Sequence, residues 1–332
     1  MRPFFSRTLF SCVVALAAFS GTARAQFAGH VSSLVIDART GAVLSESDAD
    51  LQRYPASLTK MMTLYMTFQA LERGSITLQD SMPVSIHASM QAPSKLGMRP
   101  GTHLAVEQAI LALVTKSAND AACVLGEYLG GGDETRFAAL MTYQARRLGM
   151  AHTTFRNASG LPDPDQVTTA RDLSVLARAL MRDFPQYYHY FGVREFPFRR
   201  HMIPNHDPLL GVYQGADGFK TGYTDLAGHN LVSSAQQGQV RLIGVVLGAS
   251  SNESRNQTMI SLLDDGFSAS GQVPLPLLKQ PGHYYALARH GGSRVAHRSH
   301  LRRGVVLVTY RSHGAPRGLH HSWASRRGHH RS

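Results

Sequence analysis

The chain has 332 residues, of which 43% are hydrophobic and 17% are charged, and its formal charge is +12 at pH 7. The apolar fraction is ordinary for a folded protein and excludes a wholly disordered or fibrous chain. The excess charge lies at the two ends, because residues 1–25 carry +3, residues 266–332 carry +11 and residues 26–265 carry −2. A nearly neutral body does not indicate a nucleic-acid partner.

Residues 1–25 have the pattern of a secretory signal peptide. Two arginines precede an apolar run of eleven residues, 9–19, and an Ala-Arg-Ala cleavage pattern stands before Gln26. The run is too short to span a bilayer, for which about 20 residues are needed. We therefore expect an exported protein of the periplasm or cell envelope.

The chain contains two cysteines, and Cys12 would leave with the signal peptide. An internal disulfide is then excluded. We interpret Cys123 as a small buried apolar residue, because the sequence around it supplies no partners for a nucleophile or a metal site. The body histidines show no ligand spacing, so no metal and no cofactor are expected.

The predicted elements place strands at both ends of the body and helices between them. The sequence predicts a hairpin of two strands, over residues 31–37 and 42–45, and three later strands. The later strands are expected over 219–223, 228–235 and 240–247, and the last is a near-continuous apolar run that should be buried on both faces. Helices are expected over 57–73, over 106–149 with a break at three glycines (130–132), over 170–182 and over 253–267.

This order predicts a mixed α/β fold, in which the first hairpin joins the last three strands in one mainly antiparallel sheet. Helices would flank the sheet, and the helical middle would form an inserted subdomain, with the site in the groove between them. Residues 26–270 would form this catalytic domain. Residues 271–332, rich in arginine and histidine, are expected to be mostly disordered or weakly folded.

A serine and a lysine one turn apart begin the first predicted helix, in Pro-Ala-Ser57-Leu-Thr-Lys60. Ser57 would lie at the positive end of the helix dipole, and Lys60 would fall on the same face. A hydroxyl becomes a nucleophile when a base lies within hydrogen-bond reach, and lysine is such a base once burial or a second cation lowers its pKa. The pair is sufficient to begin acyl transfer, although Ser-x-x-Lys alone is a common chance match.

Two further strings follow in a fixed order. Ser117-Ala-Asn119-Asp supplies a second hydroxyl and an amide, and Lys220-Thr221-Gly222-Tyr supplies a second lysine on a predicted strand. Glycine at position 222 would let a substrate backbone lie against that strand. Together the three motifs are those of class A β-lactamases and penicillin-binding proteins.

The chain resembles the low-molecular-mass penicillin-binding proteins of the serine D-alanyl-D-alanine carboxypeptidase family. A fourth string, Asn-Ala-Ser-Gly-Leu-Pro at 157–162, supports the resemblance, which covers residues 27 to about 270. It implies the penicilloyl-serine transferase fold and a penicillin-sensitive enzyme that removes the terminal D-alanine of peptidoglycan stem peptides. The implied partners are that peptide and β-lactam antibiotics as acylating inhibitors, with no cofactor.

The resemblance implies three catalytic residues. Ser57 would attack the carbonyl of the penultimate D-alanine, Lys60 would take its proton, and Ser117 would help to pass a proton to the leaving nitrogen. Lys220 would contribute charge that keeps Lys60 neutral. The backbone N–H groups of Ser57 and Tyr223 would hold the oxyanion. Each donor would stabilise the transition state by about 3–4 kcal/mol.

It also implies the substrate-binding residues. Asn119 would hold the substrate amide, and Thr221 and Arg255 would bind the terminal carboxylate, which suits a guanidinium. Gly222 and Tyr223 would complete the strand that receives the peptide. Histidine commonly stands where this chain has Tyr223, so effects of that side chain on rate or pH dependence are not implied.

The C-terminal end departs from the family. Larger members add a β-rich domain and an amphipathic membrane anchor, and residues 271–332 match neither, so the resemblance does not imply membrane attachment. We expect this basic tail to bind an anionic envelope surface through its arginines.

Three alternatives remain at this point. A DD-endopeptidase that cuts peptidoglycan crosslinks would use the same site. A β-lactamase needs a deacylating glutamate, and none of the three between the second and third motifs, Glu127, Glu134 and Glu195, stands in a Glu-x-x-Leu-Asn string. A non-catalytic wall-binding protein is disfavoured because every catalytic position is present.

Overall fold

The structure, a computed structural model, describes residues 31–278. The predicted signal peptide and the predicted basic tail lie almost wholly outside these residues, so both stay predictions. Within 31–278, no helix is long and apolar enough to cross a membrane.

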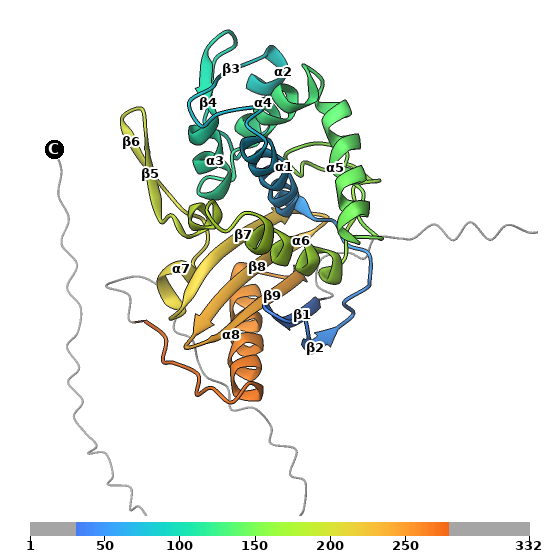
Figure 1. The fold of residues 1–332 in the computed structure, drawn as a ribbon, viewed down its shortest axis with the longest axis vertical. Helices are drawn as coiled ribbons and strands as arrows, with labels where there is room; N and C mark the ends of the chain where they lie inside the picture. The colour runs from blue at the N-terminus through green and yellow to red at the C-terminus, as the bar shows by residue number, and fades with distance from the viewer. Residues whose placement is uncertain (1–30, 279–332) are drawn as a thin grey trace, which may run out of the picture. The chain divides into compact units, whose positions relative to one another are not determined.

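A five-stranded sheet forms the centre of the fold (Figure 1). It has the order β2-β1-β9-β8-β7, and every neighbouring pair is antiparallel. The first hairpin therefore joins the last three strands, as predicted. The strands are β1 (Ser32–Asp37), β2 (Val43–Ser47), β7 (Ala216–Thr224), β8 (Gly228–Gln237) and β9 (Val240–Ala249).

The two faces of the sheet bury different cores, because side chains alternate along a strand. On β9, Ile243 and Val245 face a core shared with helix α6 (Ala170–Asp183). Leu242 and Val246 face the core under helix α8 (Asn252–Ala269). The continuous apolar run predicted to be buried on both faces is buried in this way, and Figure 1 shows helices on either side of the sheet.

A helical subdomain packs beside the sheet, and its main helices follow the predicted stretches, except that the stretch 106–149 has a second break, at 115–118, which carries Ser117. They are α1 (Lys60–Glu72), α3 (Val106–Val114), α4 (Asn119–Gly130) and α5 (Glu134–Leu148). Helix α4 ends where Gly131 takes the left-handed conformation, φ +73°. Asp133 then caps α5 by accepting hydrogen bonds from Thr135 N and Arg136 N. The predicted break at 130–132 is confirmed.

The predicted helix over 57–73 begins as a 3-10 turn, η1 (Ala56–Thr59), before α1. Seven other short elements were not predicted, because three to five residues are too few to display a periodicity. They are β3 (Ser81–Pro83), α2 (Ile86–Ser89), β4 (His103–Ala105), η2 (Tyr188–Gly192), β5 (Glu195–Phe198), β6 (His201–Pro204) and α7 (Leu209–Val212).

Candidate active site

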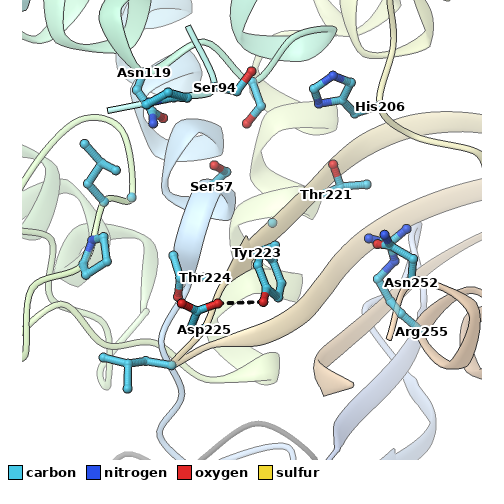
Figure 2. A pocket seen from close by; sticks show the side chains of 17 residues that line it. Ser57, Ser94, Asn119, His206, Thr221, Tyr223, Thr224, Asp225, Asn252 and Arg255 are labelled. Carbon is cyan, nitrogen blue, oxygen red and sulfur yellow. Dashed lines mark hydrogen bonds between the residues drawn. The ribbon is translucent and has the colours of Figure 1, made fainter. Parts of the chain in front are cut away.

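The three motifs meet at one cavity of about 790 Å³, between the edge strand β7 and the helical subdomain (Figure 2). Seven of the nine predicted site residues line it: Ser57, Ser117, Asn119, Thr221, Gly222, Tyr223 and Arg255. The other two, Lys60 and Lys220, are buried, with at most 1% of their surface exposed. The fold therefore assembles residues that are up to about 200 positions apart in the chain.

Two glycines hold the turn that carries Ser57. Gly160, in the fourth string, has φ +85°, and a Cβ built there would lie 1.8 Å from the carbonyl oxygen of Ala56. Gly222 brings β7 against the same turn, since its Cβ would lie 3.2 Å from Ser57 N. A side chain at position 160 is incompatible with this packing. The fourth string thus packs against the turn that carries Ser57.

The Lys60 amine lies among three oxygen atoms. Its Nζ lies 3.0 Å from Ser57 Oγ and 2.7 Å from Asn119 Oδ1, and it also donates to the backbone carbonyl of Ser159. A neutral lysine has two N–H groups and one lone pair. Asn119 and Ser159 accept the two N–H groups, so the lone pair of the neutral amine points to the Ser57 hydroxyl.

Asn119 is oriented by a contact at the other end of its amide. Its Nδ2 donates to the carbonyl of Ala92 at 2.9 Å, which directs Oδ1 toward Lys60. Both ends of the amide are therefore engaged within the protein. In this structure Asn119 positions the lysine, while its expected contact with a substrate amide stays a proposal.

Burial and a second lysine lower the pKa of Lys60. Loss of solvent is the largest cause of this depression, and the charge of Lys220 adds to it. The carboxylates of Asp120 and Glu134 oppose the shift, but the pKa still lies well below its ordinary value of 10.5. A neutral amine beside a hydroxyl is the state that a general base requires.

Lys220 is itself buried on β7, where its Nζ donates to the carbonyl of Thr221 at 2.8 Å. Burial lowers its pKa to about 7; Asp207 raises this pKa and Arg255 lowers it. The charge that acts on Lys60 therefore depends on the burial of Lys220 and on the opposing charges of Asp207 and Arg255.

The backbone of Ser117 is strained, because its φ of +60° lies in the left-handed region that residues other than glycine rarely adopt. Its Oγ is buried and has no hydrogen-bond partner among the described residues. A buried hydroxyl without a partner is rare, and it lies on the wall of the same cavity as Ser57. The arrangement leaves this hydroxyl free to bond an incoming group.

Tyr223 and Arg255 differ in exposure. The Tyr223 side chain is 53% exposed; its hydroxyl donates to Asp225 Oδ1 at 2.7 Å and its ring stacks on His229 at 4.3 Å. Arg255 is 3% exposed, lies in the first turn of α8 and reaches the cavity. Its guanidinium donates to Asn256 Oδ1. Arg255 therefore lies inside the site and is not a surface residue of its helix.

The sequence reasoning missed several residues of the cavity wall, notably Ser94 and His206. His206 belongs to the segment before α7, and its backbone N–H bonds Thr115 O beside the second motif. Burial, Lys220 and Lys116 lower the pKa of His206 to about 4, so it is neutral near pH 7. No local pattern around His206 marks it, because only the tertiary contact brings it to the site.

Cys123 is fully buried, as predicted, but the expectation that it lacks partners is wrong. His87, Glu127 and Glu134 surround its sulfur, and two of them come from elements other than α4. Burial and the two carboxylates raise the pKa of the thiol, which excludes it as a nucleophile near neutral pH. None of these four residues lines the active-site cavity.

Residues 21–251 match the family model described as D-alanyl-D-alanine carboxypeptidase, peptidase family S11. The chain belongs to this family. It is 39% identical over 241 residues to D-alanyl-D-alanine carboxypeptidase DacC of Escherichia coli, an alignment that covers 70% of this chain and 60% of that protein. It is 32% identical to DacF of Bacillus subtilis, over 74% of this chain and 64% of that protein. The chain thus spans less than two thirds of the length of these relatives.

Two solved structures share the fold of this S11 member. Penicillin binding protein 5 of Haemophilus influenzae is 32% identical with a TM-score of 0.69, over 73% of this chain and 72% of that one. Penicillin-binding protein D2 of Listeria monocytogenes, in its ampicillin-bound form, is 31% identical with a TM-score of 0.63, over 71% of this chain and 96% of that one. The predicted fold and the predicted family are both confirmed.

Proposed function

We propose that the protein is an exported serine D-alanyl-D-alanine carboxypeptidase, which removes the terminal D-alanine of peptidoglycan stem peptides through an acyl-enzyme on Ser57. The contact that carries the proposal joins Lys60 Nζ to Ser57 Oγ at 3.0 Å. A buried lysine with a lowered pKa beside a hydroxyl at a cavity is a base and its nucleophile. Relatives and solved neighbours named as carboxypeptidases and penicillin-binding proteins support the same reaction.

In the acylation step, Ser57 Oγ attacks the carbonyl carbon of the penultimate D-alanine while its proton passes to Lys60 Nζ. The oxyanion would lie against the Ser57 N–H and the β7 edge, which Gly222 allows to approach. Collapse breaks the C–N bond, and the proton returns through Ser117 to the departing amine. Water then attacks the ester, with Lys60 again as base, and releases the shortened peptide.

Substrate recognition would use the positive side of the cavity. Thr221 and Arg255 line it together, and Lys220 lies buried beside Thr221. The terminal carboxylate of the peptide would bind at this end, which places the scissile bond toward Ser57. The same charges would bind the carboxylate of a β-lactam antibiotic.

The proposal is tested by incubating the purified protein with muropeptides that contain pentapeptide stems and D-alanyl crosslinks. A carboxypeptidase releases free D-alanine and leaves the crosslinks intact, which mass spectrometry detects as loss of one residue from the uncrosslinked stems. Uncrosslinked monomers without free D-alanine would instead assign a DD-endopeptidase. If neither product forms, the proposed reaction is wrong.

Slow release of penicillin is expected after acylation. Within the described residues, the carboxylate that lines the cavity is Asp225, and no glutamate lines it. Glu127 and Glu134 instead contact Cys123. We therefore expect stoichiometric, long-lived labelling by fluorescent penicillin, measured as band intensity after a chase with unlabelled antibiotic. Multiple turnover at a rate typical of β-lactamases would contradict this.

The acylation rate should depend on pH in a bell shape. Lys60 acts as a free base, so the rate rises as pH passes its lowered pKa. The charge of Lys220 keeps Lys60 neutral and attracts the substrate carboxylate, so the rate falls as Lys220 loses its proton. Since its pKa is about 7, the alkaline limb of kcat/KM should begin near that pH.

Two variants test the assignment of this limb to Lys220. Lys220→Arg keeps its charge at every accessible pH, so the alkaline limb should disappear. Asp207→Asn removes the anion that raises the pKa of Lys220, so the limb should move to lower pH. An alkaline limb that is identical in the wild type and in Lys220→Arg would assign it to another group.

The basic tail, residues 271–332, would hold the enzyme at an anionic envelope surface. Its net charge of +11 comes from ten arginines and Lys279, without any acidic residue. We expect truncation after residue 278 to abolish salt-sensitive sedimentation with anionic vesicles while penicillin labelling continues. Unchanged sedimentation of the truncated protein would refute this role.

A further inference from the structure

Four potential metal ligands converge in the helical subdomain, outside the active-site cavity. They are the Cys123 thiol, the His87 imidazole and the carboxylates of Glu127 and Glu134. We propose that these four side chains form a tetrahedral zinc site. His87, Cys123 and Glu127 each present a ligand atom within 4.8 Å of the other two.

The distances fit one zinc ion. Cys123 Sγ lies 3.4 Å from His87 Nδ1, 3.4 Å from Glu134 Oε2 and 3.7 Å from Glu127 Oε1. His87 Nδ1 lies 3.2 Å from Glu127 Oε1 and 3.7 Å from Glu134 Oε2. With Zn–S about 2.3 Å and Zn–N or Zn–O about 2.0–2.1 Å, tetrahedral ligand atoms are separated by about 3.3–3.6 Å. Three of the ligand atoms already lie close together, and Glu134 Oε2, which lies near the sulfur and the imidazole, would have to move toward Glu127 to complete the tetrahedron.

Three helices supply the ligands. Cys123 and Glu127 are one turn apart on α4, so their side chains share a face. His87 lies on α2, and Glu134 is the first residue of α5. Gly126 lets this region pack closely, because a Cβ there would lie 2.8 Å from Ala158 Cβ and 3.4 Å from Glu134 Cγ. A metal ion would join α2, α4 and α5.

Outer contacts orient the ligands, as they do in established zinc sites. Glu134 Oε1 accepts a hydrogen bond from Ala158 N at 2.9 Å, which directs Oε2 toward the sulfur. Ser85 Oγ donates to Glu127 Oε1 at 2.8 Å. His87 Nε2 lies 3.0 Å from the amide nitrogen of Gln91. Metal binding at Nδ1 requires Nε2 to carry the proton, so the Gln91 amide would turn over and accept that proton through its oxygen.

The charges of the cluster also favour a cation. The side chains of Glu127 and Glu134 are only 14% and 10% exposed, and their ion pairs within residues 31–278 are both with His87. Two carboxylates and a sulfur at this depth are stabilised by a divalent ion. The thiol proton would pass to solvent on binding. His87 is 60% exposed, so an ion can reach the site from its side.

The ligand types select zinc over the common hard cations. Calcium and magnesium take oxygen ligands, whereas thiolate and imidazole suit zinc. Four protein ligands leave no open coordination position, which is typical of a structural site. The ion would therefore stabilise the subdomain and not take part in the reaction at Ser57.

Cobalt(II) provides a sulfur-specific probe, which is needed because imidazoles are common metal ligands and the tail contains nine histidines. The full chain is used with Cys12→Ala, so that Cys123 is the one thiol. Cobalt should give a near-ultraviolet thiolate-to-metal charge-transfer band that one equivalent of zinc removes. Absence of the band in folded, reduced protein would overturn the proposal.

Variants identify the ligands. Cys123→Ser should lose the band, and His87→Ala should lower cobalt affinity at least 10-fold, about what loss of even an outer-shell partner costs. His103→Ala, at an exposed histidine outside the cluster, is the matched control and should behave as the wild type. Circular dichroism checks the fold of each variant. A band unaffected by His87→Ala would overturn the assignment of the site.

Thermal unfolding gives a second measurement. Zinc at 100 times its Kd should raise the melting temperature by about 5–10 °C, because it binds the folded chain. At the same zinc concentration this rise should fall to about half or less in His87→Ala, because its affinity is at least 10-fold lower, and it should be retained in His103→Ala. An equal rise in both variants would assign the stabilisation to zinc bound elsewhere and would refute the proposed site.

Discussion

Ser57→Ala should abolish covalent labelling by fluorescent penicillin and lower D-alanine release by about 10⁶-fold, as loss of the nucleophile does in serine hydrolases. Ser57 Oγ is the hydroxyl 3.0 Å from the buried lysine, and its turn is held by Gly160 and Gly222. Alanine removes Oγ without altering that packing, so folding should be retained. Gel fluorescence and release of D-alanine measure the two effects.

The control for this substitution is Ser75→Ala, at an exposed serine whose hydroxyl donates to the Ala70 carbonyl near the end of α1. It should label and turn over as the wild type does. Labelling that survives Ser57→Ala would assign the nucleophile to another hydroxyl. Ser117 would then be replaced first, because its hydroxyl lies at the cavity wall without a hydrogen-bond partner among the described residues.

Lys60→Gln should lower the acylation rate by about 10²–10⁴-fold, the usual contribution of a general base. The amide can still occupy the space between Asn119 and Ser159, but it cannot take the proton of Ser57. Stopped-flow acylation by a chromogenic β-lactam measures the rate. Labelling should still reach completion on long incubation, because the nucleophile is present.

Lys60→Arg separates the role of base from the role of a positive charge. A guanidinium keeps its proton at every accessible pH, so the rate should fall as far as in Lys60→Gln if Lys60 is the base. If the lysine contributed only charge, the arginine variant would retain most of the activity of the wild type. That result would overturn the assigned role.

The sequence predicted which residues meet at the candidate site, but not how they are arranged there. Ser57 and Lys60 could be paired from spacing because residues three apart lie on one helix face. Even there, the expected helix begins as the 3-10 turn η1, which carries Ser57, and continues as α1, which begins at Lys60. The two side chains still meet. The order of the motifs identified Ser117 and Lys220 without any knowledge of their distance.

The electrostatic control of the site was not predictable from the sequence. Asp207 has no motif, yet its carboxylate raises the pKa of Lys220. Asn119 was expected to hold substrate, whereas its amide bonds Lys60 and Ala92 in the folded protein. Effects of this kind depend on burial and on distances between segments, which no local pattern records.

The cysteine cluster is another arrangement of this kind. Glu127 follows Cys123 by one helical turn and could be paired with it from the sequence alone. His87 and Glu134 come from separate elements, and their approach depends on the short helix α2 and on close packing at Gly126. Local ligand spacing in the sequence therefore does not mark this cluster.

By itself, the sequence determined the order of strands and helices, the joining of the first hairpin to the last three strands, and the family. These properties follow from periodicity, glycine breaks and four short strings, all of which act over neighbouring residues. Only the tertiary structure decided which groups are buried together: Lys60 with Lys220 and Asn119, and Cys123 with His87 and two glutamates. Desolvation and charge pairing act through space, so pKa values and ligand sets emerge only when distant segments pack.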